Sequence, residues 1–239
     1  MKNYRNTSRN LLIKMSAAAL LFLLLTSCLK DHNTYYNPPT ALLSFIQASP
    51  DEPQLDFFLN NNKVNQAFIN YGDTFDYFSA YAGHRTASFY TAGTMTKIFS
   101  DTITLNQNMA YSLFLANKPS SPEILLLTDS ISRPSSGNAS IRFVNVSPDA
   151  PPVSLAIQGG QVLASNEPYK GSTSFMPIAG GKNYAFEVRQ GTTNTVLATL
   201  TNVNLSSGFV YTIWFHGLVA STNNSDKLSI GIITNAYYN

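Results

Sequence analysis

The stretch that decides the fold is Phe143-Val-Asn-Val-Ser-Pro-Asp149, because a second version, Phe45-Ile-Gln-Ala-Ser-Pro-Asp51, stands 98 residues earlier. The two copies stay aligned without a gap for about fifty residues, and a two-residue insertion follows. Aligned pairs include Val64 with Val162, Tyr71 with Tyr169, Gly83 with Gly181 and Tyr111 with Tyr211. Repetition at a fixed spacing indicates one structural unit that is used twice.

The repeat predicts how the chain is divided. A polar stretch rich in Pro, Ser and Gly separates the two copies and is typical of a linker. The residues before the first copy contain Asn37-Pro38-Pro39 and are expected to form an extended tether. The predicted segments are a signal peptide over 1–27, a lipidated tether over 28–40, repeat 1 over 41–130, a linker over 131–138 and repeat 2 over 139–239.

Each copy has the pattern of antiparallel strands. Apolar residues alternate with polar ones in about seven short runs per copy, such as Leu55, Phe57 and Leu59 in the first and Val153, Leu155 and Ile157 in the second. Alternation with a period of two indicates strands with one buried face. Outside the first 27 residues, no stretch keeps a helical period. We therefore predict an all-β fold of two tandem immunoglobulin-like sandwiches of about seven strands each.

The N-terminus is typical of an exported lipoprotein. Residues 1–15 carry basic side chains and no acid, and a short apolar run ends in Leu25-Thr26-Ser27-Cys28, which has the form of a lipobox. The run is shorter than the ~20 apolar residues of a membrane span. Cys28 is the single cysteine, so lipidation explains a thiol that has no partner. We predict cleavage before Cys28 and attachment of acyl chains such as palmitate; a plain signal peptide with a chance cysteine is the alternative.

Charge and location follow from that processing. The whole chain has 15 basic and 13 acidic residues, but the signal segment holds four of the bases and no acid, which leaves the mature chain at net −2. A basic footprint for nucleic acid is therefore not expected. Because Leu29 and not Asp follows the cysteine, we predict the outer membrane of a Gram-negative cell envelope, at its surface or periplasmic face. The expected membrane contact is the lipid on Cys28.

The second copy resembles a bacterial family built on a domain of unknown function. The resemblance lies in Phe143-Val-Asn-Val-Ser-Pro-Asp-Ala-Pro-Pro-Val153, in Tyr169 before the hydroxyl-rich residues 172–174, and in Gly181 before a further strand. The first copy is more divergent but keeps Ser49-Pro50-Asp51. Members of that family are exported, often lipid-anchored, tandem β-sandwiches. The resemblance thus implies fold and location, and it implies no activity.

The Ser-Pro-Asp motif is predicted to be a structural turn. Proline fixes its own backbone angle and holds the preceding serine in an extended conformation. The aspartate is expected to accept hydrogen bonds from backbone N–H groups one or two residues further on. A calcium or sugar ligand is the alternative, although calcium needs several more oxygen ligands and only Glu52 is near in sequence. The motif residues are Ser49, Pro50 and Asp51 in repeat 1 and Ser147, Pro148 and Asp149 in repeat 2.

Signals for catalysis are weak throughout the chain. Asp73 and Asp76 could form a glycosidase pair, but a solubilising turn is the simpler interpretation. His32, His84 and His216 lack metal-ligand spacing and are predicted to lie in the tether or at surface turns. Neither a nucleophile elbow nor a phosphate-binding loop occurs. The sequence predicts a protein that is not an enzyme and needs no metal or cofactor.

Aromatic residues of the first copy are the candidate ligand contacts. Phe58, Phe75 and Tyr81 correspond to Ala156, Thr173 and Ala179 in the second copy. Rings exposed on a sheet can stack on sugars or anchor a protein partner. Packing within the core or between domains is the alternative, and Trp214 is expected to be buried in one of these ways. Glycan binding would be favoured if Phe58, Phe75 and Tyr81 formed one solvent-facing stripe.

The sequence thus predicts a lipid-anchored envelope protein with a non-catalytic binding or structural role. One specific alternative is a glycan-binding accessory lipoprotein that uses the aromatic residues of repeat 1. Another is an adhesion or fimbria-like subunit that associates through an exposed strand edge. An enzyme would require several carboxylates or a histidine to meet in one cleft.

Overall fold

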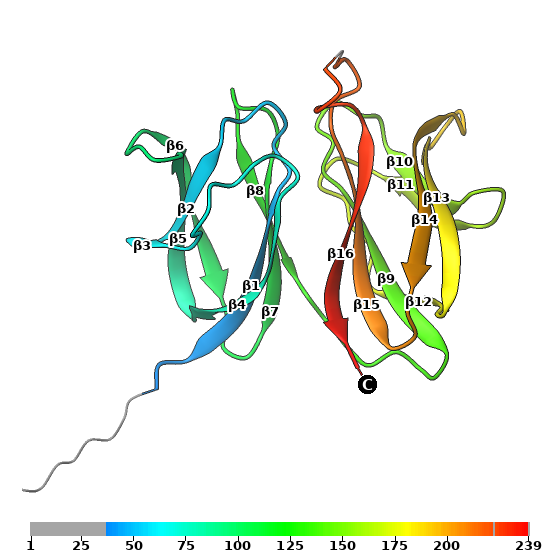
Figure 1. Cartoon of the computed structure of the whole chain (residues 1–239), viewed down its shortest axis with the longest axis horizontal. Helices are drawn as coiled ribbons and strands as arrows, with labels where there is room; N and C mark the ends of the chain where they lie inside the picture. The colour runs from blue at the N-terminus through cyan, green and yellow to red at the C-terminus, as the bar shows by residue number, and fades with distance from the viewer. Residues whose placement is uncertain (1–36, 222, 239) are drawn as a thin grey trace, which may run out of the picture. The chain divides into compact units, whose positions relative to one another are not determined.

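A computed structural model describes residues 37–221 and 223–238. Its strands number sixteen and form four sheets of four strands each, which make two sandwiches (Figure 1). This arrangement confirms the predicted all-β fold of two tandem β-sandwiches. Among the described residues, no helix is long and apolar enough to cross a membrane. The predicted signal peptide and most of the tether, with Cys28 and His32, lie outside the described residues.

The first sandwich is built from the first repeat. One of its sheets has the order β4-β1-β7-β8 and the other has the order β3-β2-β5-β6. The third strand is only two residues long. The strands are β1 Thr40–Gln47, β2 Leu55–Leu59, β3 Asn62–Lys63, β4 Thr74–Tyr81, β5 Gly83–Thr91, β6 Lys97–Leu105, β7 Ala110–Ala116 and β8 Glu123–Thr128.

The second sandwich repeats this arrangement strand for strand. Its sheets have the orders β12-β9-β15-β16 and β11-β10-β13-β14. The residues between the eighth and ninth strands join the two sandwiches. The strands are β9 Asn138–Asn145, β10 Val153–Ile157, β11 Val162–Glu167, β12 Met176–Ala179, β13 Lys182–Gln190, β14 Val196–Leu205, β15 Phe209–His216 and β16 Ser229–Tyr237.

Each sandwich has eight strands, where the sequence predicted about seven. The first strand of each repeat pairs in parallel with the seventh, β1 with β7 and β9 with β15. The eighth strand then pairs in antiparallel fashion with the seventh. An immunoglobulin constant domain places its first, second, fifth and fourth strands in one sheet. Here the first, fourth, seventh and eighth strands share a sheet, so the strand order differs from that of an immunoglobulin domain.

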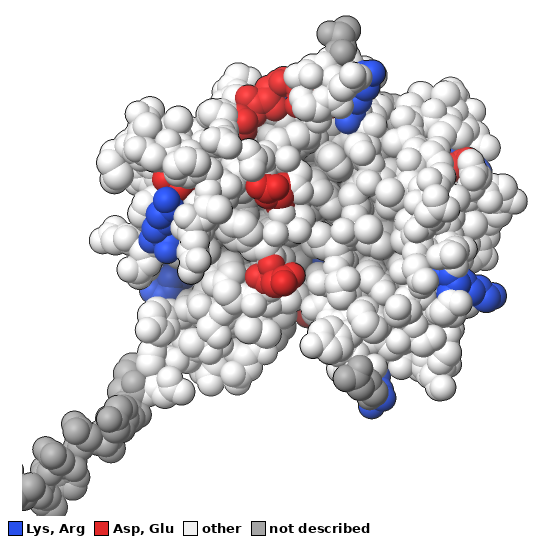
Figure 2. Space-filling model, in the orientation of Figure 1, with Lys and Arg blue, Asp and Glu red and all other residues white. Residues whose placement is uncertain are grey.

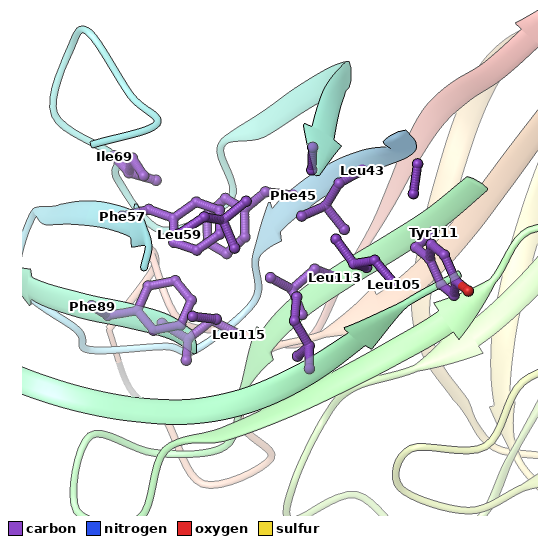
Figure 3. Close-up of a cluster of buried hydrophobic side chains, with 14 of the residues drawn as sticks. Leu43, Phe45, Phe57, Leu59, Ile69, Phe89, Leu105, Tyr111, Leu113 and Leu115 are labelled. Carbon is purple, nitrogen blue, oxygen red and sulfur yellow. The ribbon is translucent and has the colours of Figure 1, made fainter. Parts of the chain in front are cut away.

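The inward faces of the two sheets form a separate core in each sandwich. In the first, the fully buried rings of Phe45, Phe57 and Phe89 stack on one another with centroid separations of 4.9–5.5 Å (Figure 3). Phe143, Phe186 and other buried apolar side chains form the core of the second. Stacked aromatic pairs add about 0.5–1.5 kcal/mol beyond the area that they bury. These residues are the apolar positions of the period-two runs.

In each sandwich, the hydroxyl group of a tyrosine stabilises one turn by a hydrogen bond to the backbone. The hydroxyl group of Tyr111 accepts a hydrogen bond from the backbone N–H of Asn106 at 3.0 Å. In the second sandwich, the hydroxyl group of Tyr211 accepts one from Ser206 at 3.1 Å. Both bonds reach five residues upstream, as in the tyrosine corner of immunoglobulin-like sandwiches. Both turns therefore have the hydrogen bond that is typical of a tyrosine corner.

A third apolar cluster lies between the two sandwiches. It joins the β4-β1-β7-β8 sheet to the β12-β9-β15-β16 sheet, and equivalent positions of the repeats meet there, such as Ile46 with Val144 and Phe114 with Trp214. The rings of Phe114 and Trp214 lie 6.3 Å apart, and Trp214 is buried, as expected. Because this layer is shared, residues 38–239 form one compact unit.

A buried polar network crosses the same interface. The guanidinium group of Arg142 on β9 forms an ion pair with Asp129, which follows β8, at 2.6 Å, and both side chains are almost completely buried. Arg142 also donates to Ser112 and Thr212, each at 3.0 Å. Further members are Tyr77, which donates to Asp129, and Asn235, which bonds to both Thr212 and Tyr77. Each charge of this network is therefore paired and hydrogen-bonded, as burial requires.

Candidate ligand-binding groove

A groove of about 990 Å³ runs along one side of the first sandwich, between β4 and the β2–β3 hairpin. These elements are the edges of the two different sheets, so the groove opens where the sandwich is not closed by a further strand. Its lining combines apolar, amide, hydroxyl and charged side chains: Leu59, Asn60, Asn62, Lys63, Val64, Gln66, Thr74, Phe75, Asp76, Phe78, Ser79, Ala80, Tyr81 and Arg85.

Strand irregularities create the groove. Leu43 pairs with Phe78 and Phe45 pairs with Phe75, so β4 has one residue more than β1 between these pairs. This bulge turns both Phe75 and Phe78 inward, where they pack against the core as the apolar floor of the groove. The other side of the groove is formed by the β2–β3 hairpin, which is short there because β3 has only two residues.

The groove also has polar and charged lining residues, and its two basic side chains, Lys63 and Arg85, are bound by neighbouring groups. Lys63 forms an ion pair with Asp56 at 2.6 Å. Burial acts to raise the pKa of Asp56, but the hydrogen bonds from Lys63, Gly93 and Asn65 outweigh it and lower that pKa. Arg85 donates to the carbonyl oxygens of Tyr81 and Ala82, and its guanidinium carbon lies 5.9 Å from the centroid of the Tyr81 ring.

The structure brings two of the three predicted aromatic contacts together. Phe75 and Tyr81 line the groove, with Phe75 half-buried and Tyr81 54% exposed. Phe58 lies on β2, in the other sheet, and its ring meets the edge of Tyr90 at 5.2 Å. A single stripe of Phe58, Phe75 and Tyr81 is therefore not formed, because these residues come from different sheets and the bulge turns Phe75 toward the core.

Sequence reasoning missed the polar residues of the groove. Asn60 and Gln66 carry no motif, and they share the groove with Tyr81 because the edges of two sheets face each other. Arg85 lies only four residues after Tyr81 and donates to its carbonyl oxygen. Residues 60–62 are three asparagines, which favour a turn, but the sequence does not show that β3 has only two residues. A local pattern could therefore not identify this wall of the groove.

The same edge is built differently in the second sandwich. There the third strand, β11, has six residues instead of two, and the fourth strand, β12, has four residues instead of eight. Pro177 lies within β12 and lacks a backbone N–H donor. The counterparts of Phe75 and Tyr81 are Thr173 and Ala179. The aromatic lining of the groove therefore belongs to the first repeat.

The two Ser-Pro-Asp motifs make equivalent hydrogen bonds. The hydroxyl group of Ser49 donates to the carbonyl oxygen of Asn117, and that of Ser147 donates to the carbonyl oxygen of Gly217 at 2.7 Å. Each acceptor directly follows the seventh strand of its repeat. Pro50 and Pro148 come directly after these serines. The contacts are those of a turn that ties the first strand to the end of the seventh.

The aspartates of the motif do not make the predicted local turn. Asp149 accepts a hydrogen bond from the backbone N–H of Val219 at 2.9 Å, far along the chain. The bond from an N–H two residues on is instead accepted by Asn145, from Ser147 at 3.0 Å. A hydrogen bond with Asp226 raises the pKa of Asp51. The local role thus falls to the residue two before the serine, Asn145 in repeat 2 and Gln47 in repeat 1.

The other predicted polar residues are dispersed. Asp73 accepts hydrogen bonds from the backbone and side-chain nitrogens of Asn70 at 2.7 and 3.0 Å, which is a turn-forming role, whereas Asp76 lines the groove. His84 contacts Thr104 at 3.0 Å on the exposed surface. In the described part of the chain, no group of three or more His, Cys, Asp or Glu side chains could hold a metal ion.

His216 is not the surface residue that the sequence predicted. Its ring stacks on Trp214 with centroids 4.0 Å apart, and its Nδ1 lies 2.6 Å from the hydroxyl oxygen of Tyr71 in the other sandwich. Burial lowers the pKa of His216 to about 4. The imidazole is therefore neutral at pH 7, and the tautomer of the ring sets the direction of its hydrogen bond with Tyr71. The sequence offered one sign of this burial: His216 stands two residues after Trp214 and therefore on the same face of β15.

We expect this histidine to make stability depend on acidity. As pH falls, an unfolded histidine takes up a proton near 6.5, whereas folded His216 does so only near pH 4. Stability present above pH 6.5 is therefore lost between 6.5 and 4, by up to about 3 kcal/mol. Urea unfolding over this range should show a smaller loss for His216→Gln than for the unchanged protein. His84→Gln is the control, and equal losses for His216→Gln and the unchanged protein would contradict the assignment.

Part of the chain matches the sequence model of a known protein family. Residues 41–156 match the family described as "Domain of unknown function (DUF4397)". The match covers the first repeat and extends through β9 into β10. It supports the predicted relation to a domain-of-unknown-function family and supplies no activity. No curated protein matches the chain.

A solved structure was also matched, with low similarity. It is described as "Crystal structure of CBMbc (family CBM26) from Eubacterium rectale Amy13K in Complex with Maltoheptaose". The match has 9% sequence identity and a TM-score of 0.27, and it covers 82% of this chain and 97% of that chain. At that TM-score the likeness carries no argument about the ligand.

Proposed function

We propose that this protein is a lipid-anchored, non-catalytic component of the Gram-negative outer membrane, and that its first sandwich binds a glycan chain. The observation that carries the glycan assignment is the groove between β4 and the β2–β3 hairpin, which combines an exposed aromatic ring with neutral hydrogen-bonding side chains. The lipobox that ends at Cys28 supports the membrane anchor.

The groove suits a ligand that is rich in hydroxyl groups. Sugars present C–H faces that stack on aromatic rings, and Tyr81 offers such a ring at one end of the groove. Asn60, Asn62 and Gln66 each carry both a carbonyl acceptor and an NH₂ donor, so they can bond to hydroxyl groups in either sense. The guanidinium group of Arg85 is held by its hydrogen bonds to the carbonyl oxygens of Tyr81 and Ala82, which reduces the cost of ordering it on binding.

The charged residues of the groove favour binding without catalysis. Glycoside hydrolysis ordinarily needs two carboxyl groups on either side of the scissile bond. Among the described residues that line the groove, Asp76 is the one carboxylate. Lys63 is engaged by Asp56, and Arg85 is engaged by backbone carbonyl oxygens.

Isothermal titration against a panel of soluble polysaccharides tests the glycan assignment. We expect heat from at least one polysaccharide and a loss of affinity of about twofold to tenfold for Tyr81→Ala, since stacking of a ring is worth about 0.5–1.5 kcal/mol. Phe58→Ala is the matched control, because it removes an aromatic ring of the same sandwich outside the groove. No heat from any polysaccharide, or an equal loss for both variants, would rule out this site.

Strand addition is the second candidate function. β4 is an end strand of its sheet, has eight residues and contains no proline. Such an edge can accept an extended segment of another chain, as an adhesion or fimbria-like subunit would require. Self-association in size-exclusion chromatography with light scattering, abolished by Ser79→Pro, would favour this function. A monomer at all concentrations would count against it.

A further inference from the structure

Arg85 is a charged residue on the inner face of a strand. It is the third residue of β5, and alternation along the strand puts it on the same face as Ala87 and Phe89, whose side chains belong to the core. Its own side chain is half-buried and lines the groove. A charge that loses part of its water needs partners, so the contacts of this guanidinium group decide what it can bind.

The guanidinium group is held by two backbone oxygens, and one of its edges is free. Nε donates to the carbonyl oxygen of Tyr81 at 2.8 Å, and Nη2 donates to that of Ala82 at 2.5 Å. Among the described residues, these bonds leave both hydrogens of Nη1 and one hydrogen of Nη2 for a ligand. Such a fork binds the two oxygens of a carboxylate or a similar oxyanion.

The charge of Arg85 is not neutralised by an acidic side chain. Within residues 37–221 and 223–238, the ion pairs join other residues. Lys63, the other basic residue of the groove, differs because Asp56 pairs with it at 2.6 Å. Asp76 also lines the groove, but it precedes Tyr81 by five residues along β4, or about 16 Å of extended strand, which places it in another part of the groove.

The second sandwich shows that the structural role of Arg85 does not need a charge. Tyr184 is the third residue of β13, as Arg85 is of β5. Its hydroxyl group donates to the carbonyl oxygen of Ala179, the last residue of β12, at 2.8 Å. Arg85 makes the same contact with Tyr81, the last residue of β4. A neutral side chain can therefore hold this strand end, and the positive charge at residue 85 needs another explanation.

The rest of the protein does not attract polyanions in general. Only 12% of residues are charged, and Figure 2 shows a mostly uncharged surface on the face drawn. Without the signal segment and its four bases, the chain keeps 11 basic and 13 acidic residues and has a net charge of −2. Binding of an acidic polymer would therefore depend on a local basic group rather than on the field of the whole protein.

We propose that the glycan bound in the groove is acidic, and that Arg85 binds the carboxylate or sulfate group of one of its sugar units. The inference rests on the glycan assignment of the proposed function. The sugar unit stacks on Tyr81, whose ring centroid lies 5.9 Å from the guanidinium carbon, and the free edge of Arg85 binds its oxyanion. Arg85 thus determines specificity for acidic sugars, whereas the amide side chains of the groove bind hydroxyl groups.

Isothermal titration with paired polysaccharides tests the inference on the mature chain, residues 28–239 with Cys28→Ser. Polygalacturonate, alginate and chondroitin sulfate would each be compared with the same polymer after reduction of its carboxylates to alcohols. Desulfated chondroitin separates sulfate from carboxylate as the group that is bound. We expect at least one acidic polymer to bind, and removal of its acidic group to weaken binding by about tenfold or more, since hydrogen bonds to charged groups are the stronger ones.

Arg85→Tyr is the most informative variant, because it introduces the residue type that holds the same strand end in the second sandwich. It should lose about tenfold in affinity for the acidic polymer and keep the affinity of the unchanged protein for the neutral form. Arg85→Gln repeats the test with a smaller side chain, and urea unfolding checks that both variants are folded. Lys182→Gln removes one exposed charge from the second sandwich and is the matched control, which should bind the acidic polymer as the unchanged protein does.

Three results would overturn the inference: binding confined to neutral polysaccharides, an equal loss for Arg85→Tyr with both forms of a polymer, or an equal loss for Lys182→Gln. The glycan assignment itself survives the first of these results if Tyr81→Ala still weakens the binding of the neutral polysaccharide. By contrast, no heat from any polysaccharide, acidic or neutral, would overturn both. Failure of the inference is therefore distinguishable from failure of the proposed function.

Discussion

Arg142→Ala should lower the free energy of unfolding by about 3–5 kcal/mol, because it leaves the carboxylate of Asp129 buried without its partner. The same change removes the donors that reach Ser112 and Thr212 across the interface. The loss should be visible as a shift of the urea midpoint of the whole chain. Unfolding of the two sandwiches should also separate into two transitions, since the interface couples them.

Two further variants make this result interpretable. Arg142→Met combined with Asp129→Leu removes both charges and should recover much of the loss, because apolar residues can replace a buried ion pair. Lys118→Ala breaks the more exposed pair with Asp149, whose atoms lie 3.6 Å apart, and should cost less than about 1 kcal/mol. A loss for Arg142→Ala that is no larger than that for Lys118→Ala would show that the network does not hold the sandwiches together.

Cys28→Ser should remove the protein from the membrane fraction of cells after a high-salt wash. The lipidated protein should stay with the membranes, because two or more acyl chains anchor far more firmly than electrostatic contact. The salt wash removes protein that is held at the membrane by electrostatic contact alone. Asn33→Ser, a change in the same tether, is the control and should leave the protein membrane-bound. Membrane association of Cys28→Ser equal to that of the control would contradict the lipid anchor.

Much of the fold was predictable from local pattern. The period-two apolar positions of the strands became the two cores, and the aligned tyrosines, Tyr111 and Tyr211, fasten equivalent turns. The repeat at 98 residues predicted two like units. The parallel pairing of β1 with β7 was not predictable, because alternation shows which face is buried but does not show which strand lies alongside.

The interface between the sandwiches escaped sequence reasoning for a related reason. Arg142 takes the position of Ser44 in the first repeat, and a basic residue in a strand is ordinarily assigned to a solvated face. Its burial depends on Asp129 and Ser112 of the other sandwich, which become neighbours only when two equivalent faces pack together. His216 was misplaced for the same reason, since Tyr71 covers it from the other sandwich.

The groove was half visible in the sequence. Comparison of the repeats pointed to Phe75 and Tyr81, which do share it, and also to Phe58, which lies elsewhere. The alternation of Leu55, Phe57 and Leu59 places Phe58 on the other face of β2, but alternation does not reveal the bulge in β4. The polar residues of the groove could not be predicted, because they come together only where the edges of two sheets lie opposite each other.

The most direct test of the binding site is a map of amide chemical shifts on the labelled mature protein during titration with a polysaccharide that gives heat. The account predicts that the largest changes fall on β4 and the β2–β3 hairpin, with Gln66, Tyr81 and Arg85 among the residues affected. Changes centred instead on Phe58 and Tyr90, or on the second sandwich, would contradict it.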